Sequence, residues 1–247
     1  MENFHGFPSF LCIFAPQKIK GLAPKNRSKK QKDKRMATED NRKRIVETAL
    51  QLFNSRGLRG VTMDDIANTL HISKRTLYET FANKEELLAE CLTQVHDDIE
   101  DRHKKIYLKV DEPLLVALYM IRVNAMSNHS YQHLITESER YYPEIHDRFF
   151  KIHTCSLRDM LTKSLNYAQD CHYLRPNVDI DTTVDFMCEF IQSHRISEVE
   201  DPKTYSRKVS EIAFTFLRGI MSTDTLRHYD EREEEFRGML DRMNENI

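Results

Sequence analysis

A cluster of hydroxyl and cationic side chains lies in the middle of the stretch TMDDIANTLHISKRTLYETFANKEEL. The cluster is Ser73-Lys74-Arg75-Thr76, and it separates short apolar groups without a glycine-rich loop. Lys and Arg bind phosphate oxygens, whereas Arg, Ser and Thr also hydrogen-bond to base edges in the major groove of DNA. Residues 41 to 84 carry eight basic and four acidic residues, although the whole chain has a formal net charge of −2 at pH 7. Together with the basic residues that precede it, this segment makes the N-terminal third of the chain better suited to a polyanion than the remainder.

Other reactive residue types do not form a recognisable site. Among the eleven histidines, the closest pairings with cysteine are His153 with Cys155 and Cys171 with His172. On a helix, neighbours and residues two apart do not face each other, so either pair would need further ligands elsewhere. The sequence contains no CxxC or HExxH motif, no glycine-rich phosphate loop and no nucleophile elbow. We therefore expect no metal, no cofactor and no enzymatic activity.

The composition favours an all-α protein. The 247 residues include only six Gly, seven Pro and no Trp, beside many strong helix formers. Five cysteines, an odd number spread along the chain, suit a reducing compartment better than a disulfide framework. No segment approaches about 18 uninterrupted apolar residues, and the N-terminal basic cluster follows its apolar stretch, in the reverse order of a secretory signal. We expect a cytoplasmic protein without a membrane span.

Residues 1 to 35 differ from the remainder in charge. They carry nine basic and two acidic residues, a local net charge of +7. We expect a disordered basic extension, and two roles stay open for it: an arm that adds non-specific phosphate contacts, or a solvated tail without a dedicated role. A third possibility is that translation begins at Met36, because an ordinary helix start follows at once.

Apolar spacing and capping residues predict two helices after this extension. The first begins at Glu39 and ends at Gly57, which provides a C-terminal cap. Its buried face has the spacing i, i+4, i+7 and i+8: Ile45, Ala49, Leu52 and Phe53. Thr62 is the expected N-cap of the second helix, which ends at His71. Both helices are therefore defined by local signals alone.

Two further helices follow after short turns. Ser73 is the expected N-cap of the third, whose residues Leu77 and Phe81 face inward, and Asn83 is the N-cap of a fourth, long helix. Two helices of about eight residues joined by a tight turn form a helix-turn-helix or any other αα-hairpin. The exposed polar side of the third helix is not needed for packing, which favours DNA binding over a plain hairpin.

The stretch from Gly57 to Leu87 resembles the DNA-binding signature of TetR-type repressors. The match covers roughly residues 40 to 88 at motif level, and the rest of the chain is similar to the family only in helical layout. Two positions depart from the family pattern. His71 stands where the family usually has Gly in the turn, and it can supply φ > 0 with some strain. Thr80 stands where the family commonly has Tyr or His, which would make a phosphate contact there shorter or absent.

The resemblance implies a set of DNA-binding residues. In this family Thr62 and Tyr78 would hold phosphates, Lys84 would meet phosphate at the start of the fourth helix, and Ser73 to Thr76 would enter the major groove. The full set of candidate DNA contacts is Thr62, Ser73, Lys74, Arg75, Thr76, Tyr78, Thr80 and Lys84.

The remainder of the chain predicts a helical bundle. The segment LLVALYMIRVNAM is apolar almost all round, as expected of a helix packed inside a bundle. The cleanest later stripe is Val209, Ile212, Ala213, Phe216, Leu217, Ile220 and Met221. We expect an extension at 1–35, a three-helix helix-turn-helix domain at 36–86, and a helical effector-binding and dimerisation domain at 87–247.

Two sites are expected in this C-terminal domain. A mixed apolar and polar effector pocket between helices is assigned to Met120, Asn124, Phe149, His153 and Met187, although each residue type is also common in an ordinary core. The resemblance implies that the two penultimate long helices pair with their copies across a two-fold axis, and Ile212, Phe216 and Ile220 are the expected interface residues. Two reading heads on a symmetric site would roughly double the specific contacts.

The function predicted from these features is a homodimeric repressor that binds double-stranded DNA. A small-molecule effector would release it from a palindromic operator, with the long fourth helix, Leu87 to about Ile106, swinging the heads away from adjacent major grooves. An alternative stays open: a DNA-bound structural or division-linked protein that is controlled by a protein partner instead of a metabolite.

Overall fold

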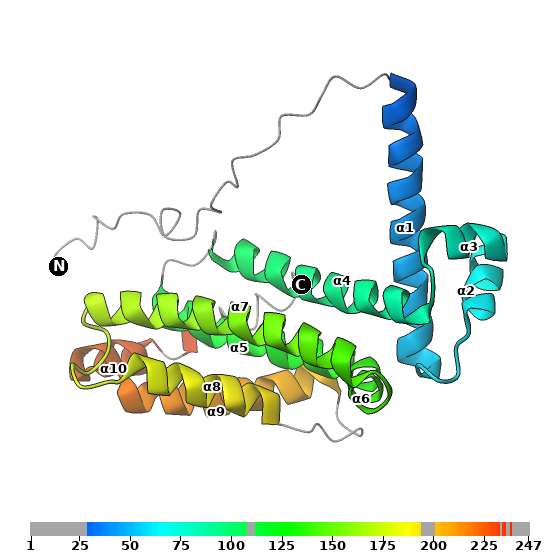
Figure 1. Ribbon diagram of the computed structural model, residues 1–247. Coiled ribbons are helices and arrows are strands. Elements are labelled where there is room, and N and C mark those ends of the chain that lie inside the picture. The colour runs from blue at the N-terminus through cyan, green and yellow to red at the C-terminus, as the bar shows by residue number, and fades with distance from the viewer. Residues whose placement is uncertain (1–28, 108–111, 194–200, 233, 236–237, 239–247) are drawn as a thin grey trace. The chain divides into compact units, whose positions relative to one another are not determined.

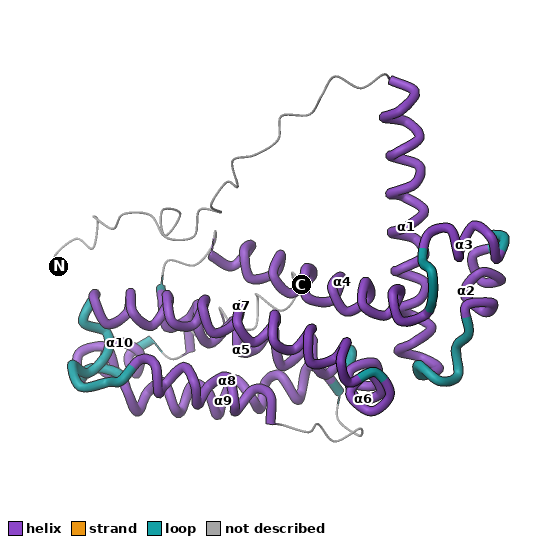
Figure 2. The backbone as a smooth tube through the Cα atoms, in the orientation of Figure 1, coloured by secondary structure: helices purple, strands orange, loops and turns teal. Residues whose placement is uncertain are grey.

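The computed structural model describes residues 29–107, 112–193, 201–232, 234–235 and 238. Within these ranges the chain is all-α, as predicted, and it forms no strand beyond an isolated bridge between Leu174 and Met221 (Figures 1 and 2). The helices are α1 (Lys29–Arg56), α2 (Met63–Leu70), α3 (Lys74–Thr80), α4 (Lys84–Tyr107), α5 (Pro113–Ser130), α6 (Gln132–Tyr141), α7 (Pro143–Asp170), α8 (Ile180–Ser193), α9 (Pro202–Ile220) and α10 (Thr223–Glu231).

The helices form two compact units. The head unit contains the described residues up to Asp97 together with Tyr131–Phe150, and the bundle unit contains Asp98–Ser130 and the described residues from Lys151 onward. This division differs from the expected boundary between residues 86 and 87. The first half of α4 and all of α6 belong to the head unit, and so does the beginning of α7.

Helix α1 starts earlier than the sequence signals indicated. It begins at Lys29 instead of Glu39, so residues 29–35 of the expected disordered extension are helical, while residues 1–28 lie outside the described part of the chain. The run KKQKDKRMATED contains no Gly or Pro, and such residues continue a helix readily. The predicted inner face of α1 is confirmed, because Ile45, Ala49, Leu52 and Phe53 are all buried.

The predicted caps of the short helices are confirmed. Thr62 begins α2 with a capping box, in which its hydroxyl accepts from the Asp65 N–H at 3.2 Å while its own N–H donates to the Asp65 carboxylate at 2.8 Å. His71 ends α2 in the left-handed region at φ 54°, the conformation in which the related family usually has Gly. Ser73 begins α3 by accepting from the Thr76 N–H at 3.0 Å.

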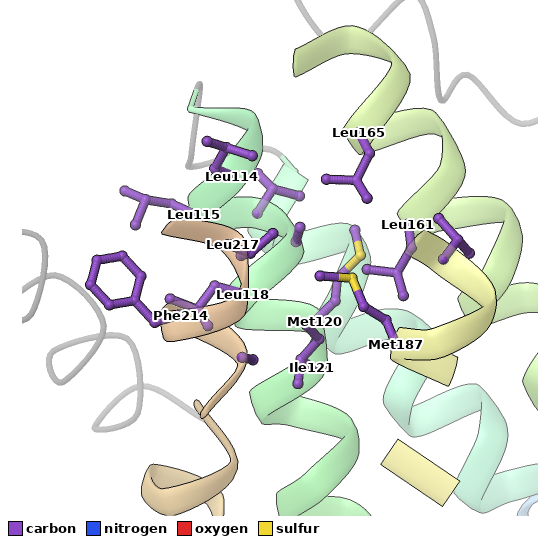
Figure 3. Packing of buried hydrophobic residues seen from close by; sticks show 14 of the residues in the cluster. Leu114, Leu115, Leu118, Met120, Ile121, Leu161, Leu165, Met187, Phe214 and Leu217 are labelled. Carbon is purple, nitrogen blue, oxygen red and sulfur yellow. The ribbon is translucent and has the colours of Figure 1, made fainter. Parts of the chain in front are cut away.

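The bundle unit has an apolar core around α5. Side chains of α5 such as Leu118, Met120 and Ile121 meet side chains from α7, α8 and α9 (Figure 3). The closest packing of α5 is along α9, and both the α5 backbone and nearly all its side chains are buried. This arrangement explains why the α5 sequence is apolar all round. It also makes each polar side chain on α5 conspicuous.

Candidate nucleic-acid interface

Helix α3 presents its polar side to solvent. Leu77 anchors the inner side in the head core, where it is fully buried, and Phe81 is buried directly after the helix. On the outer side the Arg75 side chain is 87 % exposed, and Tyr78 keeps about half of its surface exposed. Because the inner residues fix the helix, the outward residues of its first turns are available to a partner.

The cations of α3 are paired with nearby carboxylates. The Lys74 ammonium lies 2.6 Å from an oxygen of Asp64 on α2, and the Arg75 Nε lies 2.8 Å from Glu79. The hydrogen bond to Asp64 raises the pKa of Lys74, which therefore stays cationic. Exposed ion pairs of this kind contribute little to stability, so a phosphate or a base edge can replace the carboxylate at small cost.

Several predicted DNA contacts also have structural roles. Thr62 holds the capping box of α2, and its hydroxyl is 2.6 Å from the Asp65 carboxylate, whose pKa this interaction lowers. The Thr80 hydroxyl donates to the Thr76 carbonyl at 2.9 Å and is half-buried. The hydroxyls of Ser73 and Thr76 are 2.8 Å apart. The contacts of these residues with DNA stay predictions, but the structure places all of them in or beside α2 and α3.

Lys84, a predicted phosphate contact, also has a structural role in the free protein. Its ammonium faces the turn between α1 and α2, where it donates to the carbonyl oxygens of Leu58 and, at 2.6 Å, Val61. It also lies 5.6 Å from the centre of the Phe53 ring. Burial lowers the pKa of this ammonium. Lys84 therefore stabilises the α1–α2 turn in the free protein, and its phosphate contact stays a prediction.

Arg42 is a supporting residue that sequence reasoning missed. Its guanidinium pairs with Glu90 of α4 at 3.0 Å, donates to the Thr80 carbonyl at 3.2 Å and lies 4.3 Å from the centre of the Phe81 ring. Arg42 thereby joins α1 to the end of α3 and to α4. The available signal was its position one helical turn before Ile45, on the side of α1 that faces the head core.

Four of the five predicted pocket residues are buried in the bundle unit. Met120 and Met187 belong to the apolar core, where Figure 3 shows them close together. The Asn124 amide donates to the Met120 carbonyl at 2.8 Å, and His153 on α7 is also buried. Phe149, the fifth, belongs to the head unit and packs edge-on against Phe150 with ring centres 5.5 Å apart.

Asn124 is the centre of a buried polar cluster. Its amide nitrogen lies 3.1 Å from His103 Nε2 on α4, a residue that the sequence analysis did not select. Its Oδ1 atom is buried and accepts no hydrogen bond within the described residues. Nearby, the Ser156 hydroxyl donates to Glu100 at 2.5 Å, and the same carboxylate oxygen is 4.0 Å from His103 Nδ1. A buried acceptor without a donor is costly, so this position suits a ligand hydroxyl or a water molecule.

An apolar groove lies on the outer side of α8 and α9. Ile212 is 51 % exposed, and Phe216 and Ile220 are half-buried, so all three predicted interface residues reach the surface. Phe186 on α8 is 52 % exposed and stacks on Phe216 at 5.1 Å, although the sequence analysis did not select it. The groove has a volume of about 390 Å³, and its lining includes Ile121, Met187, Phe190 and Ala213. Clustered exposed apolar side chains of this kind indicate a binding surface.

The described residues provide neither a membrane-spanning helix nor a cluster of metal ligands. None of the helices in the described part of the chain combines the length and apolar character that a bilayer crossing requires. Over the same described ranges, no three His, Cys, Asp or Glu side chains converge into a set that could hold a metal ion. His153 is buried and Cys155 exposed on α7, consistent with the different directions that residues two apart take on a helix.

A substitution of Lys84 tests its structural role in the absence of DNA. Met keeps an apolar stem near the Phe53 ring but lacks the ammonium, so the carbonyl oxygens of Leu58 and Val61 would lose a charged donor. We expect Lys84→Met to lower the free energy of unfolding by about 1–3 kcal/mol, measured by urea denaturation of the free protein. Lys43→Met, at an exposed position of α1, is the control. An unchanged free energy of unfolding would contradict the structural role.

The chain is similar in sequence to known bacterial regulators. The model of the family "Bacterial regulatory proteins, tetR family" matches residues 45–91, the segment that carries α2, α3 and most of α1's inner face. The HTH-type transcriptional repressor KstR2 of Mycobacterium tuberculosis (strain ATCC 25618 / H37Rv) is 32 % identical over 159 residues. That alignment covers 62 % of this chain and 80 % of the relative.

Solved structures share the fold. The ketosteroid transcriptional regulator KstR2 of Mycobacterium tuberculosis superposes with a TM-score of 0.53 at 22 % identity, covering 74 % of this chain and 95 % of that one. A proposed transcriptional regulator from Saccharomonospora viridis, solved in complex with choline, has a TM-score of 0.62 at 17 % identity and covers 74 % and 99 % of the two chains. The sequence match to the repressor, the family match over the reading head and the shared fold agree, and the chain belongs to the TetR family of DNA-binding transcriptional regulators.

Proposed function

We propose that the chain is a cytoplasmic, homodimeric repressor that reads a palindromic operator through α3 and is released by a small-molecule effector. The observation that carries the proposal is the exposed side of α3, where Arg75 extends into solvent from a helix capped by Ser73. A repressor role also agrees with the KstR2 relative, which is an HTH-type transcriptional repressor. In this function Lys74, Arg75 and Thr76 contact bases in the major groove of DNA, and Tyr78 contacts a phosphate.

The operator can be found by retention of genomic DNA. We expect the purified protein, at near-physiological salt, to retain a few palindromic fragments from the genome of its source organism. Arg75→Ala should lose this preference, because Arg75 supplies the longest base-reading side chain of α3, whereas Arg227→Ala on α10 should not. Sequencing of retained fragments measures the outcome. Dispersed retention that ignores the Arg75 change would refute base reading by α3.

The dimer forms through the apolar groove of α8 and α9 in this proposal. Phe186 and Ile212 expose about half of their surfaces there, and pairing with a second copy would remove that apolar surface from water. A two-fold arrangement also presents two α3 helices to the two half-sites of a palindrome. The groove and the operator symmetry therefore point to the same assembly.

A charge in the groove should separate the protomers. We expect a mass near twice 29.3 kDa for the wild-type chain in light scattering, and a mass near 29.3 kDa for the double variant Phe186→Glu/Ile212→Glu. Two new carboxylates from each copy, four in the dimer, would cost more to bury than the apolar contact provides. Ile152→Glu on α7, at a residue 54 % exposed, is the matched control and should stay dimeric. A dimeric double variant would remove this groove from the interface.

The effector in this proposal is a neutral, largely apolar molecule with a hydroxyl group. Asn124 follows the apolar core residues Met120 and Ile121 along α5, and its buried Oδ1 can accept a hydrogen bond from a ligand hydroxyl. A neutral ligand avoids the cost of moving a charge from water into this buried position. The description of the KstR2 neighbour as a ketosteroid regulator is consistent with a ligand of this polarity. Binding would favour a conformation in which α4 carries the heads away from adjacent major grooves.

A test of this pocket uses steroid probes. We expect one or more hydroxylated ketosteroids to release wild-type protein from its operator in a fluorescence anisotropy titration. Asn124→Leu, which keeps the volume but removes the acceptor, should bind the operator normally and require at least about tenfold more steroid, as expected for one lost buried hydrogen bond. Release of Asn124→Leu at the wild-type steroid concentration would exclude this residue from effector recognition.

A further inference from the structure

The side chain of Glu137 binds the turn between α1 and α2 from a distant part of the chain. Glu137 lies on α6, and its Oε2 accepts a hydrogen bond from the Leu58 N–H. Next to it, Gly57 has φ +77°, and a Cβ atom at this position would lie 2.9 Å from the same carboxylate oxygen. The close approach therefore requires Gly57 on one side and a carboxylate on the other.

Lys84 binds the other polar group of the Leu58 backbone and carries the opposite charge to Glu137. Its ammonium donates to the Leu58 carbonyl, so the N–H and C=O groups of one residue are bound by an anion from α6 and a cation from α4. The Leu58 side chain is fully buried in the head unit. Within the same cluster, His133 Nδ1 lies 3.4 Å from the Asn54 carbonyl, and its Nε2 lies 3.7 Å from Glu137. Two residues of α6 thus hold the C-terminal end of α1.

The α1–α2 turn, which Glu137 and Lys84 bind, leads directly into the helix-turn-helix formed by α2 and α3. Val61, whose carbonyl also accepts from Lys84, precedes the N-cap Thr62 of α2, and α2 packs against α3. A short connection with both of its polar groups bound at Leu58 has little freedom, so the direction of α2 follows from the position of α6 and of the α4 N-terminus. All of these residues belong to the head unit.

We infer that Glu137 is a positioning residue for DNA binding: its carboxylate fixes the α1–α2 turn and so the orientation of α3 required for base reading. This inference rests on the proposed repressor function. Glu137 binds the backbone of Leu58 and acts on α3 through it. Glu137 also lies close in sequence to the bundle unit, because its helix α6 leads through Tyr142 into α7, and α7 continues into that unit.

The test compares specific with non-specific DNA. The specific probe is the duplex that wild-type protein selects from a random-sequence pool, and the other is a random duplex of equal length. We expect Glu137→Ala to bind the selected duplex at least about tenfold more weakly, as for a lost charge-assisted hydrogen bond, and the random duplex within about twofold of wild type. Glu137→Gln should recover part of the loss, because its amide oxygen can accept from the Leu58 N–H. Glu139→Ala removes the same charge from an exposed position of α6 and should match wild type.

The outcomes separate the inference from the function on which it rests. If wild-type protein selects a sequence and Glu137→Ala binds it normally, the inference is wrong and the repressor function stands. If Glu137→Ala weakens both duplexes equally in protein shown to be folded by circular dichroism, Glu137 has only a structural role. If Glu137→Ala is unfolded, Glu137→Gln decides by the same comparison of two duplexes. Selection of no sequence by the wild-type chain would overturn the repressor function and this inference together.

Discussion

Helix α3, which reads DNA in the proposed function, depends on its neighbours, because a helix of seven residues is not stable in water by itself. Its first turn is closed by the Ser73 cap, and its inner side is anchored by Leu77 in the head core. Its last carbonyl, at Thr80, accepts from Arg42 of α1. These contacts fix the backbone of α3 while its outer side stays in solvent. A rigid support under an exposed polar face is the physical requirement for reading base edges.

The bundle unit meets a different constraint, since its central helix is buried on every side. Polar groups on such a helix cost free energy unless they find partners. Asn124 finds Met120 and His103 for its amide nitrogen but leaves its oxygen without a donor within the described residues. At the surface of the same unit, α8 and α9 expose the apolar side chains Phe186 and Ile212, so the described part of the unit has an unsatisfied polar group in its interior and apolar groups on its exterior. Both exceptions are more informative than the regular core around them.

Sequence reasoning succeeded where the interactions are local. The caps at Thr62 and Ser73 were predicted because each bonds to a backbone group three residues away. The contacts of Arg42 with Glu90 and of Glu137 with Leu58 join residues 48 and 79 positions apart, and no periodicity encodes such pairs. The early start of α1 was missed because a run of helix formers without a breaker carries no boundary signal. The buried faces of the helices were predicted from the sequence, but the long-range hydrogen bonds that join one helix to another were not.

The hydrogen bonds of Glu137 and Lys84 to Leu58 also bear on how the bundle unit can influence the head unit. Under the proposed function, an effector changes DNA binding only through its different affinities for two conformations of the protein. Helices α4 and α7 each contribute residues to both units, so each is a continuous covalent connection between them. Lys84 begins α4, and Glu137 lies on the helix that precedes α7, and both bind the backbone of Leu58. The Leu58 backbone in the α1–α2 turn is therefore one position at which α4 and α6 both contact the chain that leads into α2. Because coupling is reciprocal, the proposed function requires that operator DNA lower effector affinity by the same factor by which the effector lowers operator affinity.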